Sequence, residues 1–337
     1  MPLYYDSWHI IVMIKWGIIG PGTIANAFAN EVCNTENGKL AAVYGRNREK
    51  ADKFAGEYNL EKSYSDIDAF LNDDDIDAVY IATPHSHHME YCEKCINAGK
   101  HVLCEKPFSY NTESSRRILD LAKEKKIFIM EALWTIFLPA IKKAKSWVES
   151  GEIGRVKLIT ADFGFKGDGN PHSRLYNPEL AGGALLDVGI YTILISNFIM
   201  NDTADKVTSN AVMTGSGVDE TTVMNLQYKD GAVASLTCGI GSDTGQNAVI
   251  YGEKGRIVIP YFSKAKAAYL YKEDGLEEKF EDEYEGKGYK YEIAEANECI
   301  EKNILESKEA SHKITLEIAQ IMDEVRNQIE LVYPFEK

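Results

Sequence analysis

Three side chains of types suited to proton transfer occur in distinctive sequence contexts. Lys106 belongs to a Glu-Lys-Pro triplet that directly follows the apolar run His101–Cys104, which predicts a lysine fixed by a proline turn at the end of a strand. Asp187 and Tyr191 are four residues apart in an otherwise apolar helical stretch, so they are expected to share one helix face. A charged aspartate in so apolar a helix needs a partner or a water-lined cleft.

Each of these residues also allows an ordinary interpretation. Lys106 can simply be an exposed loop residue, because most lysines are exposed. Asp187 is equally compatible with a simple ion pair to an arginine such as Arg174, and Tyr191 with a place in the core. The residues alone leave both interpretations open.

A glycine-rich turn predicts the binding of a dinucleotide. Residues 20–25, Gly-Pro-Gly-Thr-Ile-Ala, fit the GxGxxA pattern where the strand run Lys15–Gly20 meets the helical run Thr23–Cys33. Backbone amides and the positive end of the helix can then meet a pyrophosphate. Because the motif opens an alternating strand and helix pattern, this interpretation is favoured over a simple tight turn. The predicted binding residues are Gly20, Gly22, Thr23 and Ile24.

The residues after the second strand run, Leu40–Tyr44, favour NADP(H) over NAD(H). NAD-specific sites usually place a carboxylate at this point to hold the ribose hydroxyls, whereas this chain has Gly45-Arg46-Asn47. The guanidinium of Arg46 is suited to pairing with a 2′-phosphate. A solvated surface arginine is the alternative.

Further cofactor-binding residues are expected at the carboxyl ends of later strand runs, where ligands enter an open parallel sheet. These residues are Thr83, Pro84, His88, Glu105 and Lys106. Nearby histidines and cysteines lack a convergent metal-ligand spacing, because consecutive residues at a helix start point apart. We therefore predict no metal site among His85, His87, His88, Cys92 and Cys95.

Alternating strands and helices must position the residues of the first half. Nearly continuous apolar strand runs separated by helices indicate a parallel sheet covered on both faces. The remaining expected elements are strand Leu40–Tyr44, helix Arg48–Tyr58, strand Ala78–Ala82, helix His87–Ala98, strand His101–Cys104, helix Thr112–Lys125 and strand Ile127–Met130. We assign residues 14–135 to an α/β domain with a doubly wound parallel sheet.

The second half, residues 136–337, is predicted to be an α+β domain with a largely antiparallel sheet. Tight-turn dipeptides flanked by strand-like runs indicate hairpins, and they occur at residues 230–231, 254–255 and 274–275. The expected longer elements are strand Arg155–Phe165 and helices Gly183–Met200, Tyr291–Leu305 and Ile314–Ile329. The last two helices are expected to cover the sheet or to return to the first domain.

The composition argues against several classes of partner. An excess of 52 acidic over 37 basic residues gives a formal charge of -15, so the surface repels nucleic acid phosphates and anionic lipids. The apolar run Ile10–Ile14 is too short to span a membrane and has no signal-peptide leader. We expect a cytoplasmic protein whose six cysteines are reduced. Residues 1–12 are expected to lie outside the fold.

Four motifs in order resemble the Gfo/Idh/MocA oxidoreductases. They are the turn at residues 20–25, Thr83-Pro84, the Glu-Lys-Pro triplet, and the stretch Gly-Gly-x-x-x-Asp-x-Gly-x-Tyr at residues 182–191. The resemblance begins near Ile14 and reaches the C-terminal helices, and residues 130–135 look like the branch of dimeric dihydrodiol dehydrogenases and NADP-dependent xylose-type dehydrogenases. It implies a Rossmann domain, a substrate-binding domain whose open sheet mediates dimerisation, and a homodimer or homotetramer.

The resemblance makes Lys106 and Tyr191 a catalytic pair, with Asp187 assisting and Arg46 on the cofactor. It implies hydride transfer between nicotinamide and a hydroxyl or carbonyl carbon of a sugar, cyclitol or cyclic diol, with a base for the hydroxyl proton. A free tyrosine titrates near pH ~10, and an adjacent ammonium lowers the pKa of the phenol. Lys106 is therefore expected to activate Tyr191.

The candidates to line a substrate pocket are Trp134, Phe163, Phe165, Arg174 and Tyr176. Ile136 stands where that branch often has arginine, so a different substrate specificity is expected. One alternative is a non-catalytic dinucleotide-binding regulator or sensor, and another is a reductase of an open-chain or tetrapyrrole-like substrate. Neither alternative calls for the motifs that contain Lys106, Asp187 and Tyr191.

Overall fold

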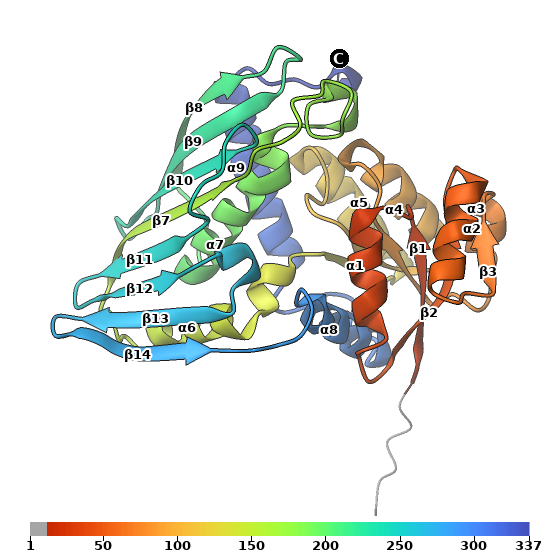
Figure 1. The fold of residues 1–337 in the computed structure, drawn as a ribbon, viewed down its shortest axis with the longest axis horizontal. Coiled ribbons are helices and arrows are strands. Elements are labelled where there is room, and N and C mark those ends of the chain that lie inside the picture. The colour runs from red at the N-terminus through yellow and green to blue at the C-terminus, as the bar shows by residue number, and fades with distance from the viewer. Residues whose placement is uncertain (1–11, 337) are drawn as a thin grey trace, which may run out of the picture.

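The protein is described by a computed structural model that covers residues 12–336. The predicted N-terminal extension, residues 1–12, therefore lies outside the described residues except for Val12. The fold contains two β-sheets, each with its own helical layers, and the second sheet faces away from the first with helices between them (Figure 1).

The first sheet has six parallel strands in the spatial order β3-β2-β1-β4-β5-β6. The strands are β1 Ile14–Ile19, β2 Gly38–Tyr44, β3 Lys62–Tyr64, β4 Ala78–Ile81, β5 His101–Cys104 and β6 Ile129–Glu131. The strand order reverses between β1 and β4, and ligands bind at such a switch point in open α/β sheets. The predicted doubly wound parallel sheet is confirmed.

Side chains alternate between the two faces of this sheet, and each face has its own apolar core. On β1, Trp16 and Ile18 pack with Phe28 of α1, whereas Ile19 belongs to the core on the opposite face. The first face is covered by α1 Thr23–Val32, α2 Arg48–Glu57 and α8 Tyr289–Glu301, and the second by α3 Ile67–Leu71, α4 His88–Asn97 and α5 Thr112–Lys125. Helix α8 is joined to β1 by a hydrogen bond from Nε1 of Trp16 to Oδ1 of Asn297, 2.8 Å long.

The second sheet has eight strands in the order β14-β13-β12-β11-β7-β10-β9-β8. The strands are β7 Val156–Gly164, β8 Lys206–Met213, β9 Asp219–Gln227, β10 Val233–Gly239, β11 Ala248–Gly252, β12 Arg256–Ile259, β13 Ala267–Lys272 and β14 Gly275–Glu281. Only the β7–β10 pair of these neighbours is parallel. The predicted, largely antiparallel sheet is confirmed, and the three predicted turns join β9 to β10, β11 to β12 and β13 to β14.

Three helices cover the inner face of the second sheet: α6 Pro139–Glu149, α7 Ile190–Met200 and α9 His312–Gln328 (Figure 1). Helix α9 also packs against α5 of the first domain. The segment Pro178–Met200 is long and apolar enough to cross a membrane, but 94% of its most apolar window is buried inside the protein. This burial is that of a core helix.

The predicted helix Gly183–Met200 differs from the structure at its start. Residues Leu185–Gly189 form a wider π-helical turn, closed by the N–H of Ile190 donating to the carbonyl of Leu185, and α7 follows. A π turn inserts an extra residue, which changes the direction of side chains in this segment. The elements β3, α3, α6 and β8 have no counterpart among the predicted elements. Of these, β3 and α3 are too short to show a hydrophobic period.

Candidate active site

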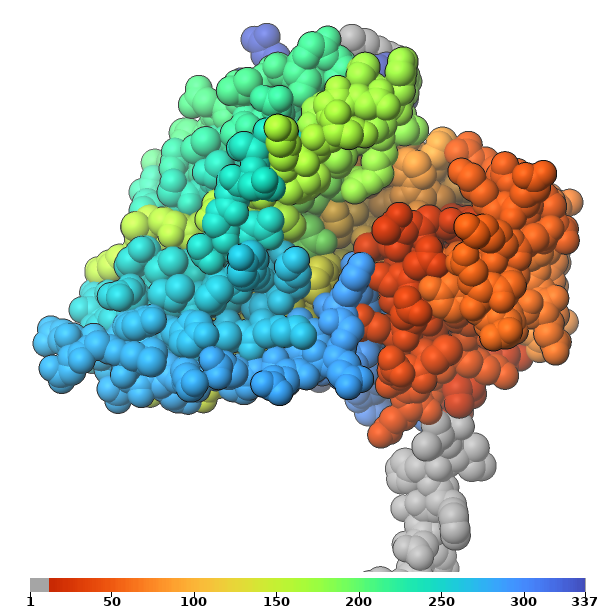
Figure 2. All heavy atoms as spheres, in the orientation of Figure 1, coloured from red at the N-terminus to blue at the C-terminus, as the bar shows by residue number. Residues whose placement is uncertain are grey.

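A pocket of about 380 Å³ lies at the carboxyl edge of the first sheet, beside the switch point. The surface is hollowed here between the first domain and the loop that follows β7 (Figure 2). The first domain contributes Gly22, Thr23, Ile24, Ala82, Thr83, Pro84, His85, Glu105 and Lys106, and the second contributes Arg174, Leu180 and Asp187. The pocket is therefore built by segments of both domains.

The glycine turn between β1 and α1 has the geometry of a phosphate-binding turn. Gly20 adopts φ +95°, and a Cβ there would lie 2.9 Å from the carbonyl oxygen of Ala82, so a side chain is excluded. At Gly22, the N-cap of α1, a Cβ would meet open space, and no side chain caps the helix. The first N–H groups of α1 are thus free to meet an anion.

The dinucleotide expected from the sequence fits the residues present around this turn. Thr23 and Ile24, the first residues of α1, line the pocket. The Thr83 hydroxyl at the end of β4 is buried and has no hydrogen-bond partner among residues 12–336. A polar ligand would satisfy this hydroxyl, and the first turn of α1 contains no acidic residue that would repel a pyrophosphate.

Arg46 lies exposed at the carboxyl end of β2. The residue before it, Gly45, packs against Pro21, and a Cβ added at Gly45 would lie 3.0 Å from the proline ring. The residue after it, Asn47, caps α2 by accepting the N–H of Lys50. In the described part of the chain, the guanidinium of Arg46 is paired with no carboxylate.

Lys106, directly after β5, reaches across to the second domain. Its Nζ donates to the main-chain oxygen of Asp187 over 2.7 Å and lies 3.4 Å from Oδ1 of the same residue. It also lies 5.1 Å from the centre of the Tyr191 ring. Since only 12% of the side chain is exposed, this lysine is a largely shielded group held between the two domains.

Asp187 is the anion at the centre of the pocket. Nη1 of Arg174 donates to Oδ1 over 2.8 Å, and Nε2 of His85 lies 3.9 Å from the same oxygen. Burial alone would raise the pKa of Asp187, but the charges of Lys106 and Arg174 hold it well below the usual range. The carboxylate therefore stays ionised, and it pairs with both the predicted arginine and the lysine of the other domain.

The phenol of Tyr191 is held by aromatic residues rather than by Lys106. Nε1 of Trp134 donates to the phenolic oxygen over 3.0 Å, and the ring of Phe163 lies 5.4 Å from that of Tyr191. Burial and the carboxylate of Glu105 raise the pKa of Tyr191 well above its ordinary value. The pKa of Tyr191 is therefore raised instead of lowered as expected, because burial outweighs the charge of Lys106, whose ammonium lies over the ring and forms no hydrogen bond to the phenol.

Two residues predicted to bind ligands have other tasks in the structure. His88 is fully buried, and its ring nitrogens lie 2.9 Å from the carbonyl oxygen of Pro107 and 3.0 Å from that of Thr83. It joins the two strand-end segments instead of lining the pocket. The hydroxyl of Tyr176 donates to the carbonyl of Ile240 over 2.8 Å, so Tyr176 stabilises the loop after β7.

The other candidates differ in their distance from the pocket. Arg174 and Glu105 line it, and Glu105 accepts a hydrogen bond from the hydroxyl of Tyr80. Trp134 and Phe163 contact Tyr191 as described, whereas Phe165 is partly buried against the core of the second domain. Ile136 is fully buried and does not line the pocket.

Two residues that the sequence does not predict as part of the site hold the segment before Asp187. The hydroxyl of Tyr333 donates to the carbonyl of Gly182 over 2.8 Å, and a carboxylate oxygen of Asp219 accepts the N–H of Leu185 over 2.8 Å. Both contacts fix the turn that leads to Asp187. The one local sequence signal for Tyr333 is that it forms a Tyr-Pro pair shortly after an amphipathic helix.

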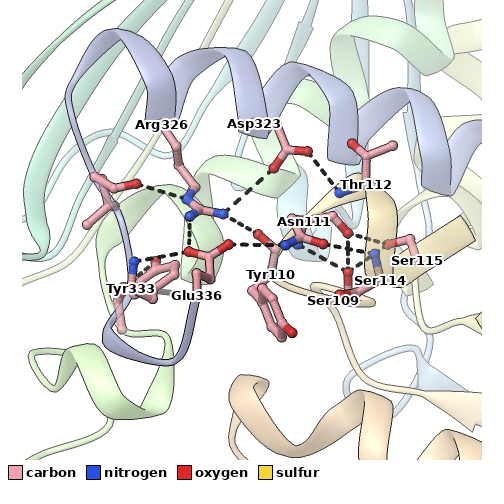
Figure 3. A network of polar contacts seen from close by, with 12 residues as sticks. Ser109, Tyr110, Asn111, Thr112, Ser114, Ser115, Asp323, Arg326, Tyr333 and Glu336 are labelled. Atoms are coloured by element: carbon pink, nitrogen blue, oxygen red, sulfur yellow. Dashed lines mark hydrogen bonds and ion pairs between the residues drawn. The ribbon is translucent and has the colours of Figure 1, made fainter. Parts of the chain in front are cut away.

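A polar network attaches the segment after Lys106 to the end of the chain. Arg326 of α9 donates to the carbonyl oxygens of Tyr110 and Leu331 and pairs with Glu336 (Figure 3). The N–H of Thr112 donates to Asp323 over 2.8 Å. The last turn of α9 and the residues after it therefore anchor the segments that carry Lys106 and Asp187.

Comparison with known proteins agrees with this architecture. A model of the oxidoreductase family with an NAD-binding Rossmann fold matches residues 14–132, and a model of the GFO/IDH/MocA C-terminal domain matches residues 141–258. Trans-1,2-dihydrobenzene-1,2-diol dehydrogenase of Danio rerio is 32% identical, with 95% of this chain and 98% of the relative covered.

Two further similarities extend over nearly the whole chain. The scyllo-inositol 2-dehydrogenase (NADP(+)) IolU of Bacillus subtilis (strain 168) is 35% identical, with 96% of this chain and 99% of the relative covered. The aldose-aldose oxidoreductase of Caulobacter crescentus has the same fold, with a TM-score of 0.86 at 22% identity over 94% of this chain and 98% of that structure. The chain therefore belongs to the Gfo/Idh/MocA family and is an oxidoreductase with an NAD(P)-binding Rossmann domain.

Proposed function

We propose that this enzyme transfers a hydride between NADP(H) and a hydroxyl or carbonyl carbon of a sugar, cyclitol or cyclic diol. The pocket carries the proposal, because it joins a dinucleotide turn of one domain to a lysine, a carboxylate and an arginine at the domain boundary. Bound nicotinamide supplies the hydride acceptor, or the donor in the reverse direction. The protein must bind and orient the substrate and move one proton.

Lys106 and Tyr191 handle that proton in the proposed mechanism. Trp134 donates to the phenolic oxygen of Tyr191, so the phenolic proton is free to be given to a carbonyl oxygen during reduction. Lys106, held by Asp187, stabilises negative charge that develops on the same oxygen. In oxidation the proton moves in the opposite sense, from the substrate hydroxyl to the ionised phenolic oxygen of Tyr191.

The preference for NADP(H) is supported by Arg46. It stands exposed at the point where a carboxylate would hold the ribose of NAD. The planar guanidinium can bind two oxygens of a phosphate through two parallel hydrogen bonds. The name of the Bacillus relative includes NADP(+), which agrees with this preference.

Hydroxyl-bearing substrates are supported by the polar groups of the pocket and by the relatives. Lys106 and Arg174 supply donors, and Asp187 supplies an acceptor, within one pocket. The relatives are named for a cyclic diol and for an inositol.

The test is the change in absorbance of reduced nicotinamide with purified protein and a panel of cyclic diols, inositols and aldoses. NADP⁺ and NAD⁺ are compared in separate reactions, and NADPH binding is measured by fluorescence titration. The proposal predicts turnover of at least one panel member with NADP⁺ as the better cofactor. NADPH binding with no turnover across the panel would contradict it and favour a non-catalytic sensor.

A further inference from the structure

His85 has a polar atom in the pocket that the proposed proton transfer does not use. The residue follows Pro84 at the carboxyl end of β4, lines the pocket and is 8% exposed. Its Nδ1 lies 3.0 Å from the main-chain oxygen of Ala181. Because a carbonyl oxygen can only accept, Nδ1 carries the proton and donates it to this bond.

The second ring nitrogen, Nε2, is consequently an acceptor. Burial, together with the charge of Lys106, lowers the pKa of His85 to about 3, so the ring is neutral near pH 7. Within residues 12–336, no donor is hydrogen-bonded to Nε2, and the polar atom 3.9 Å away, Oδ1 of Asp187, is itself an acceptor. A lone pair therefore faces the pocket beside the carboxylate that holds Lys106.

We propose that Nε2 of His85 accepts a hydrogen bond from a second substrate hydroxyl, on the carbon next to the one that is oxidised. The inference rests on the proposed function, which assigns the reacting oxygen to Lys106 and Tyr191. Nζ of Lys106 and Nε2 of His85 lie 3.4 and 3.9 Å from the same oxygen of Asp187. The shared oxygen brings both groups to one part of the pocket, where hydroxyls on neighbouring carbons of one substrate can reach them.

His85 is a specificity residue in this scheme and not the catalytic base. A neutral imidazole with a pKa near 3 is too weak a base to hold the proton of an alcohol. The acceptor Nε2, however, has no hydrogen-bond partner when the substrate lacks the second hydroxyl. A simple alcohol then leaves a partly buried polar atom without a partner, which lowers its binding relative to that of a diol.

Two amide variants separate the two ring nitrogens. His85→Asn keeps an N–H donor near the position of Nδ1 and removes the acceptor at Nε2, whereas His85→Gln offers an amide oxygen near Nε2 and removes the anchor to Ala181. For each protein, kcat/KM is measured with trans-cyclohexane-1,2-diol and with cyclohexanol. Dissociation constants of both alcohols are also measured by calorimetry in complexes with NADPH, in which no oxidation occurs.

The wild-type protein is expected to prefer the diol by about tenfold or more, the usual value of one hydrogen bond in a partly buried site. His85→Asn should reduce this preference to about threefold or less at unchanged NADPH affinity, and His85→Gln should retain it. An unchanged preference in His85→Asn, or a loss confined to NADPH affinity, would overturn the inference. Absence of any wild-type turnover across diols, cyclitols and aldoses would instead reject the proposed function itself.

Discussion

Replacing Arg46 with alanine should weaken NADPH binding selectively. The side chain is exposed at the end of β2 and has no carboxylate partner within residues 12–336, so its charge is available to a 2′-phosphate. A hydrogen bond to a charged group contributes about 1.5–3 kcal/mol. Because solvent screens an exposed guanidinium, we expect the lower part of this range, about 1.5–2 kcal/mol, or a 10- to 30-fold higher Kd.

The assay is a fluorescence titration of NADPH and of NADH with the wild-type protein and two variants. Arg48→Ala is the matched control, since Arg48 already binds Asp52 over 2.9 Å on the surface of α2. Arg46→Ala should lose affinity for NADPH but not for NADH, and Arg48→Ala should change neither. Equal losses for both cofactors in Arg46→Ala would refute the assignment of this residue to the 2′-phosphate.

Three further results are expected. Tyr191→Phe should lower kcat for carbonyl reduction by about 100- to 10,000-fold with unchanged NADPH affinity, because only the proton donor is lost; wild-type kcat in steady-state kinetics would contradict this. Burial raises the pKa of Tyr191, so the phenol is neutral near pH 7 and the rate of reduction should vary little with pH. The rate of oxidation, which needs an ionised proton acceptor, should rise with pH, and a rate that falls with pH would exclude Tyr191 as that acceptor. Tyr333→Phe removes the hydrogen bond to Gly182 and should lower both kcat and the free energy of unfolding, the latter by about 1 kcal/mol in urea titrations. A variant as stable as the wild-type protein would show that this hydrogen bond does not hold the segment before Asp187.

The parts of the site that sequence analysis predicts are those tied to strand ends. Lys106 could be placed at the sheet edge because an apolar strand precedes it and parallel strands end at a common edge. The turn at Gly20 could be recognised because its local geometry requires glycine. Sheet type and the three hairpins follow in the same way from short-range patterns.

Contacts between distant segments could not be predicted. The partner of the Tyr191 phenol, Trp134, is 57 residues away, and the Tyr333 that holds Gly182 is 151 residues away. No local pattern indicates which side of a ring faces the pocket, so the sequence presents His85 only as a potential metal ligand and predicts that His88 contacts the cofactor. The π turn before α7 likewise depends on a carboxylate of another element, that of Asp219.

Lys106 of the first domain is proposed to perform chemistry on a substrate held by the second domain. Turnover and NADPH affinity of Lys106→Ala test it most directly, with Lys94→Ala as a control, because Lys94 pairs with Glu90 on the exposed face of α4. We predict that Lys106→Ala loses turnover while its Kd for NADPH stays within about tenfold of the wild-type value. Wild-type turnover in Lys106→Ala would contradict the account.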